Sequence, residues 1–534
     1  MSTSSVSAAP DPSESEQDIE SLNPSFCANC RKLCILPEDL DSKEQLHVEY
    51  TLEDITEAAK RKCLLCCHFL TFLQSGDDIE NIAGDGGFHA HLIYITNHPS
   101  HDASDLPGLH SIKFSIDGYT GLDDRRFGLQ LRVAEYNLSN GTPFVYQRHK
   151  HNVPRSVRVT TALTSWTGDE AHLRTITEWI RKCEETHSAC RQVKLERTGT
   201  FVPTRLINVS TAHLPRLTIT AGLSDKKDRR YITLSHRWQN RDMPKLLTSN
   251  LHELLEGIQP NTLPAVFLDA IDLCRRLSIP FVWIDALCLI QDDPADCDHE
   301  ISSMGEIYAN AFVHMGATRA SNIPGTGLYT RLDSTGLAPF YIDFQWGARR
   351  FSRILHEATA VKRINQSKLM SRGWVFQERL LSPKSIYFDD LLGWECTQLV
   401  TTELHPEGPP PLSRRPVWGV DLPFKVPSLL GRDTVDTDPR TVDHHLRWLA
   451  LAQWFSMCQL TYDGDALPAL SGLARAFQAK LQDRYVAGIW YKDIVRSLLW
   501  LKPRLFKEIS DGQLDRPQKS HRGSSSSITA PMQQ

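Results

Sequence analysis

The chain has 534 residues, of which 41% are hydrophobic and 23% charged, so it has the profile of a folded protein and not of a disordered or collagen-like one. Its 59 Lys and Arg stand against 64 Asp and Glu, which excludes the basic excess that non-specific nucleic-acid binding requires. Apolar runs also stay well short of the ~18–20 residues of a membrane-spanning helix, so we expect neither a nucleic-acid nor a membrane partner.

The two ends of the chain are poor in apolar residues. The first 25 residues carry five acidic and no basic side chains and lack the apolar stretch of a secretory signal. We therefore expect disordered tails at 1–25 and 506–534 and a cytoplasmic location. In a reducing compartment the 13 Cys are expected to be thiols, metal ligands or nucleophiles and not disulfides.

Paired cysteines open the segment 26–163, which we interpret as a Cys-rich N-terminal α+β region. Alternating apolar stretches such as 91–95 suit half-buried strands there. The spacing between the two pairs exceeds the ~15–20 residues of a compact zinc ribbon, although an inserted arm would accommodate it. The sequence predicts a possible structural zinc site, with packed thiols as the alternative, and requires no other cofactor. The four candidate ligands are Cys27, Cys30, Cys63 and Cys66.

A helical pattern at 170–192 carries Cys183, His187 and Cys190 at i, i+4 and i+7, which places all three on one helix face. Three side chains are one ligand short of a structural zinc site. The pattern therefore favours a packed core over a metal site.

Short apolar strands alternate with helical segments between residues 231 and 317. We expect strands at 231–236, 281–285 and 312–317, and helices at about 245–257, 264–278 and 298–311. This order is typical of a parallel sheet covered by helices on both faces, a Rossmann-like α/β unit. Neither GxGxxG nor GxxxxGK[ST] follows any of these strands, so dinucleotide binding of the usual kind has no support.

The rest of the chain divides by composition. We expect a helix at 371–381, a hairpin at 384–396 that turns at Asp389–Asp390, and a Pro-rich loop at 405–440. A helix-rich C-terminal region follows at 441–505, with Trp448, Leu451 and Trp454 at helical spacing. The α/β domain is then bounded by residues 164–404.

Four motifs carry a resemblance to a known family. They are YITLSHRWQN (231–240), DAIDLCRRLSIPFVWIDALCLIQDD (269–293), EISSMGEIYANAFVHMGATRASN followed by GTGL (300–328), and SRGWVFQERLLSPKSIYFDDLLGWEC (371–396). In this order and spacing they resemble the fungal heterokaryon incompatibility (HET) domain family, and the resemblance extends over about 180–500. The chain departs from the family's pattern beyond Trp500, where the Trp- and Ser-rich strand of many relatives is not found.

The resemblance implies a role in fungal non-self recognition and regulated cell death. The distant similarity of HET domains to Toll/interleukin-1 receptor (TIR) domains implies a flavodoxin-like, TIR-like sheet, with NAD as a possible substrate of cleavage. Two hypotheses stay open. One is an enzyme with NAD glycohydrolase-like activity, and the other is a non-catalytic signalling or scaffold module that self-associates as a homo-oligomer or binds an unknown protein partner.

Candidate site residues lie where the parallel strands end, because ligands bind outside the carboxyl ends of strands in open α/β sheets. Ser235, His236 and Trp238 follow the first strand. The second strand is followed by Asp285, Cys288 and Gln291. The alternative is that these aromatic and thiol side chains pack the sheet edge and that Asp285 caps a helix.

Cleavage of a nicotinamide glycosidic bond needs a carboxylate near the ribose. Glu300 and Glu306 point to different faces of one helix, and we favour Glu300, together with Asp285, because a helix N-terminus keeps a carboxylate ionised. An ordinary N-terminal helix Glu would occupy the same position. Cys288, His236 and Asp285 also supply the residue types of a thiol hydrolase, but an apolar context makes Cys288 inert.

Four further candidates share a helical surface that mixes charged and aromatic side chains. This surface is either a cleft wall or a salt-bridge cluster that holds structural elements together. The four residues are Arg372, Trp374, Gln377 and Glu378.

Overall fold

The computed structural model describes most of the chain between residues 23 and 498. The described residues are 23–36, 46–74, 88–96, 109–118, 129–134, 136–139, 142–149, 152–158, 163–196, 201–210, 214–223, 228–238, 243–331, 334–347, 349–357, 364–365, 367–408, 425–430 and 443–498. The expected C-terminal tail, nearly all of the N-terminal one and most of the Pro-rich loop lie outside them. In the described part, we find no helix with the length and apolarity to cross a bilayer.

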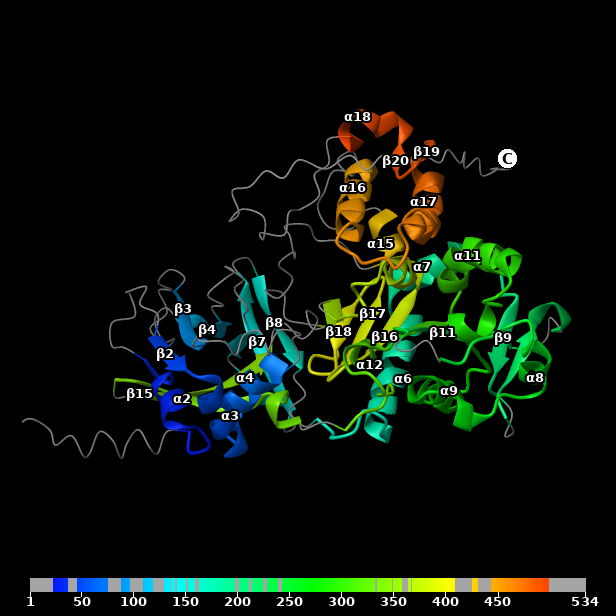
Figure 1. The fold of residues 1–534 in the computed structure, drawn as a ribbon. Coiled ribbons are helices and arrows are strands. Elements are labelled where there is room, and N and C mark those ends of the chain that lie inside the picture. Colours follow the sequence, from blue (N-terminus) through cyan, green and yellow to red (C-terminus); the bar gives the residue numbers. More distant parts are fainter. Residues whose placement is uncertain are drawn as a thin grey trace, which may run out of the picture.

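An eight-stranded mixed sheet forms the centre of the α/β part (Figure 1). Its strand order is β10-β9-β12-β11-β13-β16-β17-β18, in which β12, β11, β13 and β16 run parallel and the remaining neighbours pair antiparallel. The bounds are β9 Arg205–Asn208, β10 Arg216–Ile219, β11 Tyr231–Ser235, β12 Phe281–Trp283, β13 Val313–Gly316, β16 Lys384–Phe388, β17 Leu392–Cys396 and β18 Val400–Thr402. The three expected strands and the expected hairpin are confirmed as strands.

Helices cover both faces of this sheet, as expected. The crossovers from β11 to β12 and from β12 to β13 run in opposite directions across the sheet, and right-handed connections therefore place their helices on opposite faces. Figure 1 shows α9 (Ala265–Arg276) below the sheet and α11 (Pro294–Ala309) above it, whereas α6 (Glu170–Glu185) runs upwards alongside the strands and contacts β17. The strand residues from Tyr231 to Ser235 are consequently all buried.

Two glycines allow α11 to approach α17 (Pro468–Leu481) closely. A Cβ on Gly305 would lie 2.8 Å from the Cα of Gly472, and a Cβ on Gly472 would lie equally close to Gly305. Because such a contact is with backbone, a larger side chain at either position would push the helices apart. This packing holds the C-terminal helices on the α11 face, where α14 (Gly373–Leu381) also lies.

Some helices begin or end differently from the expectation. The segment 170–192 contains two helices, α6 and α7 (Ser188–Glu196), which are separated at Thr186 and His187. The helix expected from 245 begins only at Leu251, because Leu246 forms a parallel bridge with Ile290. The remaining helices of this part are α8 Leu251–Glu256, α10 Asp285–Cys288 and α12 Thr318–Asn322.

The N-terminal region has its own seven-stranded sheet, in the order β1-β14-β15-β5-β4-β3-β2, beside a separate three-stranded sheet, β6-β7-β8. Its helices are α2 Ala28–Lys32, α3 Leu52–Lys60 and α4 Leu64–Gln74. Its strands are β1 Ile35–Leu36, β2 Leu46–Tyr50, β3 Phe88–Thr96, β4 Leu109–Gly118, β5 Leu129–Ala134, β6 Tyr136–Ser139, β7 Thr142–His149 and β8 Asn152–Arg158. Because helices and mainly antiparallel sheets share this region, its architecture is α+β.

One hairpin of the N-terminal sheet comes from much later in the chain. β14 (Phe340–Trp346) and β15 (Arg349–Glu357) follow β13 in sequence, but they pair with β1 and β5. Their buried side chains, including Phe340 and Phe344, join the N-terminal hydrophobic core. The sequence analysis placed this hairpin inside the unit 164–404, whereas the structure shows that it completes the N-terminal sheet.

The described C-terminal part, 443–498, is helix-rich as expected and packs around an aromatic cluster. Trp448 lies edge-on to Phe477 and Trp490, with ring centroids 5.3 and 5.4 Å apart. Its indole Nε1 donates to the carbonyl oxygen of Gly488 at 3.0 Å. The elements around it are α15 Val426–Leu430, α16 His444–Phe455, α17, β19 Tyr485–Val486, β20 Ile489–Trp490 and α18 Ile494–Ser497.

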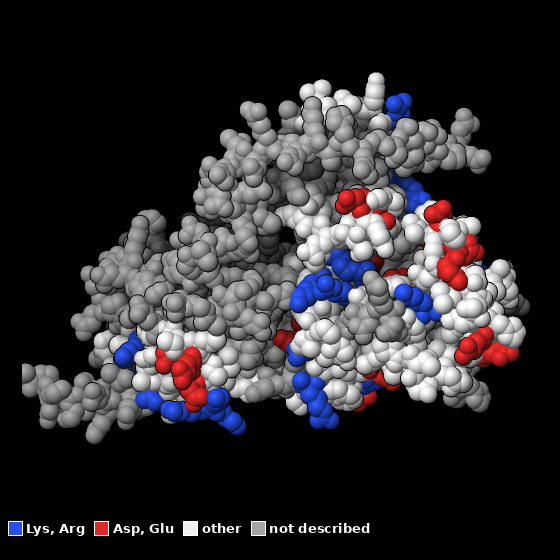
Figure 2. Space-filling model, viewed as in Figure 1, with Lys and Arg blue, Asp and Glu red and all other residues white. Residues whose placement is uncertain are grey.

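Charges of both signs are spread over the surface of the described residues. Figure 2 shows basic and acidic side chains interspersed on one face. This mixture agrees with a net charge of −5 for the whole chain.

Candidate functional site

A cluster of buried polar side chains lies at the carboxyl end of β11. Ser235, the last residue of this strand, donates a hydrogen bond from Oγ to Oε2 of Glu378 on α14. Tyr308 of α11 interacts with both Ser235 and Glu378. His236 follows directly and, like Ser235, is about 97–98% buried. Three elements far apart in sequence therefore bring a carboxyl, two hydroxyls and an imidazole to the edge where ligands bind in open α/β sheets.

Burial shifts the titration of this cluster. Desolvation raises the pKa of Glu378 to about 7, and Asp285 adds to the shift, whereas Arg372 and the hydrogen bonds from Ser235 and Tyr308 oppose it. Desolvation lowers the pKa of His236 to about 4, with Arg372 adding and Asp285 opposing. At neutral pH the His236 imidazole is therefore uncharged, and the Glu378 carboxyl is only partly ionised.

Among the described residues, neither ring nitrogen of His236 has a hydrogen-bond partner. The nearest charged atom given for it is Oδ1 of Asp285, 3.8 Å from Nδ1. The ring is held by aromatic packing, edge-on to Phe267 at 4.9 Å and stacked on Trp238 at 6.4 Å. Since buried polar atoms are normally hydrogen-bonded, an imidazole with two unpaired nitrogens is typical of a site that receives a ligand or water.

Three partly exposed side chains surround the buried residues Ser235, His236 and Glu378, which form the floor of the site. Trp238 donates from Nε1 to Oδ2 of Asp285 at 3.1 Å, and Asp285 begins the short helix α10 after β12. Arg372, at the start of α14, donates from Nη1 to the carbonyl oxygen of His236. The Asp285 side chain remains 27% exposed. An indole, a carboxylate and a guanidinium thus connect the floor to solvent.

The residues after Asp285 take supporting positions. Gln291 donates from Nε2 to the Asp285 carbonyl oxygen at 3.2 Å, which fixes the turn that carries this carboxylate. Cys288 is completely buried, and desolvation raises the pKa of its thiol to about 12. Because a thiolate does not form there at neutral pH, the structure gives no support to a Cys288 nucleophile.

Glu300 lies apart from Glu378 in the structure. It is 1% exposed and its Oε1 is 3.6 Å from Nη2 of Arg205, which also binds Asp296. Burial raises the pKa of Glu300, with Arg205 opposing. Glu300 precedes Tyr308 by eight residues on α11, which is about 12 Å along the helix axis. It therefore belongs to the charged group around Arg205 and not to the polar cluster around Glu378.

The four candidate side chains at α14 contact two different parts of the molecule. Arg372 and Glu378 join the polar cluster, whereas Trp374 donates from Nε1 to Oδ2 of Asp465 at 3.0 Å. Gln377 accepts from the backbone N–H of Gly472 at 3.3 Å. Trp374 and Gln377 therefore attach the C-terminal helices to the sheet.

Tyr308 and Phe267 are cluster residues that the sequence analysis did not single out. Both are aromatic residues at helix positions, where the pattern indicates core packing. The position of Tyr308, two helical turns after Glu300, was the sequence feature that could have identified it as a site residue. Which aromatic faces the strand ends depends on the helix rotation, which periodicity alone does not fix.

Residues 231–378 match the family model of the Heterokaryon incompatibility protein (HET). We call this matched segment the HET region. The resemblance inferred from the motifs is confirmed over these residues. No curated protein and no solved structure was found to match the chain.

The polar cluster lies wholly inside the HET region. Its first member, Ser235, ends the first matched strand, and Glu378 is the last matched residue. The two cysteine pairs of the N-terminal region lie outside it.

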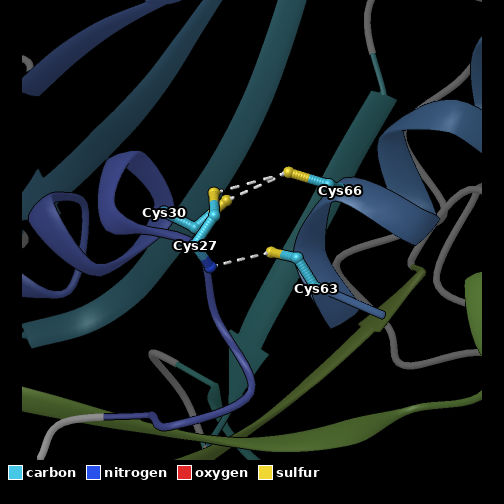
Figure 3. Close-up of side chains that lie close together, drawn as sticks. All are labelled: Cys27, Cys30, Cys63 and Cys66. Atoms are coloured by element: carbon cyan, nitrogen blue, oxygen red, sulfur yellow. Dashed lines mark hydrogen bonds between the residues drawn. The ribbon is translucent and has the colours of Figure 1, made fainter. Parts of the chain in front are cut away.

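The two N-terminal cysteine pairs meet in the structure despite the long spacing between them (Figure 3). Cys27 and Cys30 stand at the start of α2, and Cys63 and Cys66 at the start of α4. The Cys66 Sγ lies 3.8 Å from that of Cys27 and 3.4 Å from that of Cys30. Four sulfurs bound to one zinc at ~2.3 Å would stand about 3.8 Å apart, so the four residues fit a tetrahedral zinc ion.

The surroundings also suit thiolate ligands. The backbone N–H of Cys27 donates to Cys63 Sγ at 3.3 Å, and both pairs sit at helix N-termini, whose dipoles favour negative charge. A bound zinc would supply structural cross-linking between α2 and α4 and no chemistry at the polar cluster.

Removal of metal from this site is expected to loosen the N-terminal region. With a zinc chelator, amide exchange should quicken across residues 26–74 while α9 keeps its protection, because only the first region loses its cross-link. Cys66→Ser should reproduce the effect, and the adjacent Cys67→Ser, whose sulfur lies outside the cluster, should not. Unchanged exchange in metal-depleted protein would show that the four residues are packed thiols.

Proposed function

We propose that this protein is a cytoplasmic effector of fungal non-self recognition that causes regulated cell death, and that its HET region cleaves a nucleotide such as NAD. The observation that carries the proposal is the buried imidazole of His236 with two unpaired nitrogens, 3.8 Å from the Asp285 carboxylate, which also acts on the buried carboxyl of Glu378. Such a convergence of titratable groups with shifted pKa values is typical of an active site.

The strand order supports a flavodoxin-like, TIR-like core. In chain order the parallel strands are arranged second, first, third and fourth, and ligands in sheets of this order bind where the direction of the connections reverses. That point lies between β11 and β13, which end at Ser235 and Gly316. The cluster occupies the β11 side of it.

The chemistry of the cluster suits a glycosidic bond between ribose and a cationic base. Departure of the base leaves an oxocarbenium-like ribose, which a nearby carboxylate stabilises. In this proposal Glu378 provides that carboxylate in place of Glu300, because Glu378 lies at the strand ends. Trp238 offers an aromatic face to the base and Arg372 a guanidinium to the phosphates.

The test is NAD loss catalysed by purified full-length protein. Glu378→Gln should lower the rate by roughly 10²–10³-fold, since shape is kept and charge is lost. The pKa of Glu378 is raised to about 7, so the rate should rise as pH passes from 6 to 8 and the carboxyl ionises. Glu300→Gln is the matched control, and it should keep activity because Glu300 faces Arg205.

Protein stability separates catalysis from structure in this test. Protonation stabilises a folded state in which the pKa of a carboxyl is raised, so Gln at 378 should not lower the melting temperature at pH 8. Full activity in Glu378→Gln would contradict the role of this residue. Loss of activity only in Glu300→Gln would return the catalytic carboxylate to Glu300.

A second candidate is a non-catalytic module that acts by self-association. It is favoured by the burial of the cluster, since Ser235, His236 and Glu378 are only 2–5% exposed and the hydrogen bond between Ser235 and Glu378 also suits a polar core. Protein that oligomerises but neither binds nor consumes NAD would support this candidate over the enzyme.

A further inference from the structure

The structure brings a fourth ligand to Cys183, His187 and Cys190, which lie around the break between α6 and α7. Cys183 lies on α6, His187 in the break before α7, and Cys190 on α7. Cys396, the last residue of β17, joins them from 209 residues beyond His187. One nitrogen or sulfur atom from each of these four residues lies within 4.8 Å of the others.

We propose that Cys183, His187, Cys190 and Cys396 form a second zinc site, which fastens the α6–α7 corner to the β17–β18 hairpin. This site lies outside the HET region and is distinct from the N-terminal cysteine cluster.

Distances and ligand types fit zinc. The His187 Nδ1 lies 3.3 Å from Cys396 Sγ and 3.9 Å from Cys190 Sγ. Nitrogen at ~2.0 Å and sulfur at ~2.3 Å from one tetrahedral zinc would stand about 3.6 Å apart. Three thiolates and one neutral imidazole form one of the usual structural zinc sets, and a site with four protein ligands leaves no position for a substrate.

The surrounding backbone supports the sulfur ligands. The N–H of Leu399 donates to Cys396 Sγ at 3.3 Å across the turn between β17 and β18. The N–H of Ala189, next to Cys190, binds Oε1 of Gln398 in the same turn at 3.3 Å. The N–H directed at Cys396 stabilises its thiolate and fixes its orientation, as surrounding hydrogen bonds do at metal sites, and the bond between Ala189 and Gln398 holds α7 against the turn.

Packing alone explains this cluster less well. Two of the three thiols are fully buried, and the imidazole nitrogen faces sulfur and not an apolar side chain. A few residues before Cys183 and Cys396, Trp179 and Trp394 already pack against each other with ring centroids 6.0 Å apart. The apolar contact between α6 and β17 is thus made elsewhere, which leaves the four polar ligands at the end of both elements to a different interaction.

The decisive measurement is the zinc content and X-ray absorption of the full-length protein purified without added metal. If both cysteine clusters bind zinc, each chain should carry two zinc ions. Together the two ions should have seven sulfur ligands and one imidazole nitrogen ligand. One zinc with four sulfurs and no nitrogen, or no zinc, would overturn the proposal. This result requires no variant and does not depend on any activity.

Variants assign the second ion to the site. Cys396→Ser should leave one zinc, Cys458→Ser should leave two because Cys458 lies outside both clusters, and His187→Cys should also leave two because it restores a fourth ligand. His187→Ala should bind the second zinc at least tenfold more weakly than His187→Cys. Two zinc ions in Cys396→Ser would contradict the assignment, and if that variant fails to fold, the absorption spectrum of the unaltered protein still decides.

Discussion

Replacement of Trp283 by alanine is expected to lower the free energy of unfolding by about 3–5 kcal/mol. The side chain is 0% exposed in β12, a strand with neighbours on both sides and helices on both faces. It packs edge-on against Tyr308 at 5.6 Å. Its indole nitrogen has no hydrogen-bond partner among the described residues, so the loss comes from packing and the cavity left behind.

Denaturant unfolding of the variant measures this effect. Tyr462→Ala is a matched control, because this aromatic side chain is 71% exposed and its removal should change stability by about 0.5 kcal/mol or less. If Trp283→Ala cost no more than the control, Trp283 would not be enclosed between the two helical layers.

Replacement of Glu395 by alanine is the second large effect, with an expected loss of about 3–5 kcal/mol. Its carboxylate lies 3.0 Å from Arg379 and 3.7 Å from Lys425, and all three side chains are at least 94% buried. Tyr387 also donates to it. Removal of the carboxylate leaves two cations buried together, which costs far more than the loss of an exposed ion pair.

The loss at position 395 should depend on pH. Desolvation lowers the pKa of Lys425 to about 8, while Glu395 acts to raise it, so the variant's Lys425 should lose its proton at a still lower pH. Above pH 8 this lysine is uncharged in both proteins, and the difference in stability should shrink. Glu57→Ala serves as the control because the Glu57–Lys60 pair is exposed and screened by solvent, so its loss should change stability little at any pH. A Glu395→Ala loss that small, at every pH, would contradict a buried ion cluster.

The central sheet was predictable because its signals are local. Strands β11, β12 and β13 are short apolar runs, and the turn at Asp389–Asp390 separates two more. Each pattern is contained within a few residues, so it can be recognised without knowledge of the partner strand. The exact start of α8 was less accessible because it depends on the bridge between Leu246 and Ile290.

Pairings between distant segments were not predictable in the same way. Nothing in residues 340–357 indicates which of the two sheets they join, because an alternating strand pattern suits either. Cys396 gave no signal as a fourth ligand for the same reason, since only the fold places it beside Cys183. At the polar cluster, sequence identified the strand-end residues, but the choice between Glu300 and Glu378 required the position of each carboxylate in space.

The β14–β15 hairpin has a consequence for how the protein is made. It lies between β1 and β5, so the N-terminal sheet is in two pieces until residues 340–357 leave the ribosome. Roughly 200 residues separate β5 from β14, a delay of about 10–40 s at typical rates of synthesis. During that time β5 exposes an unpaired edge, with which a strand of another chain can pair.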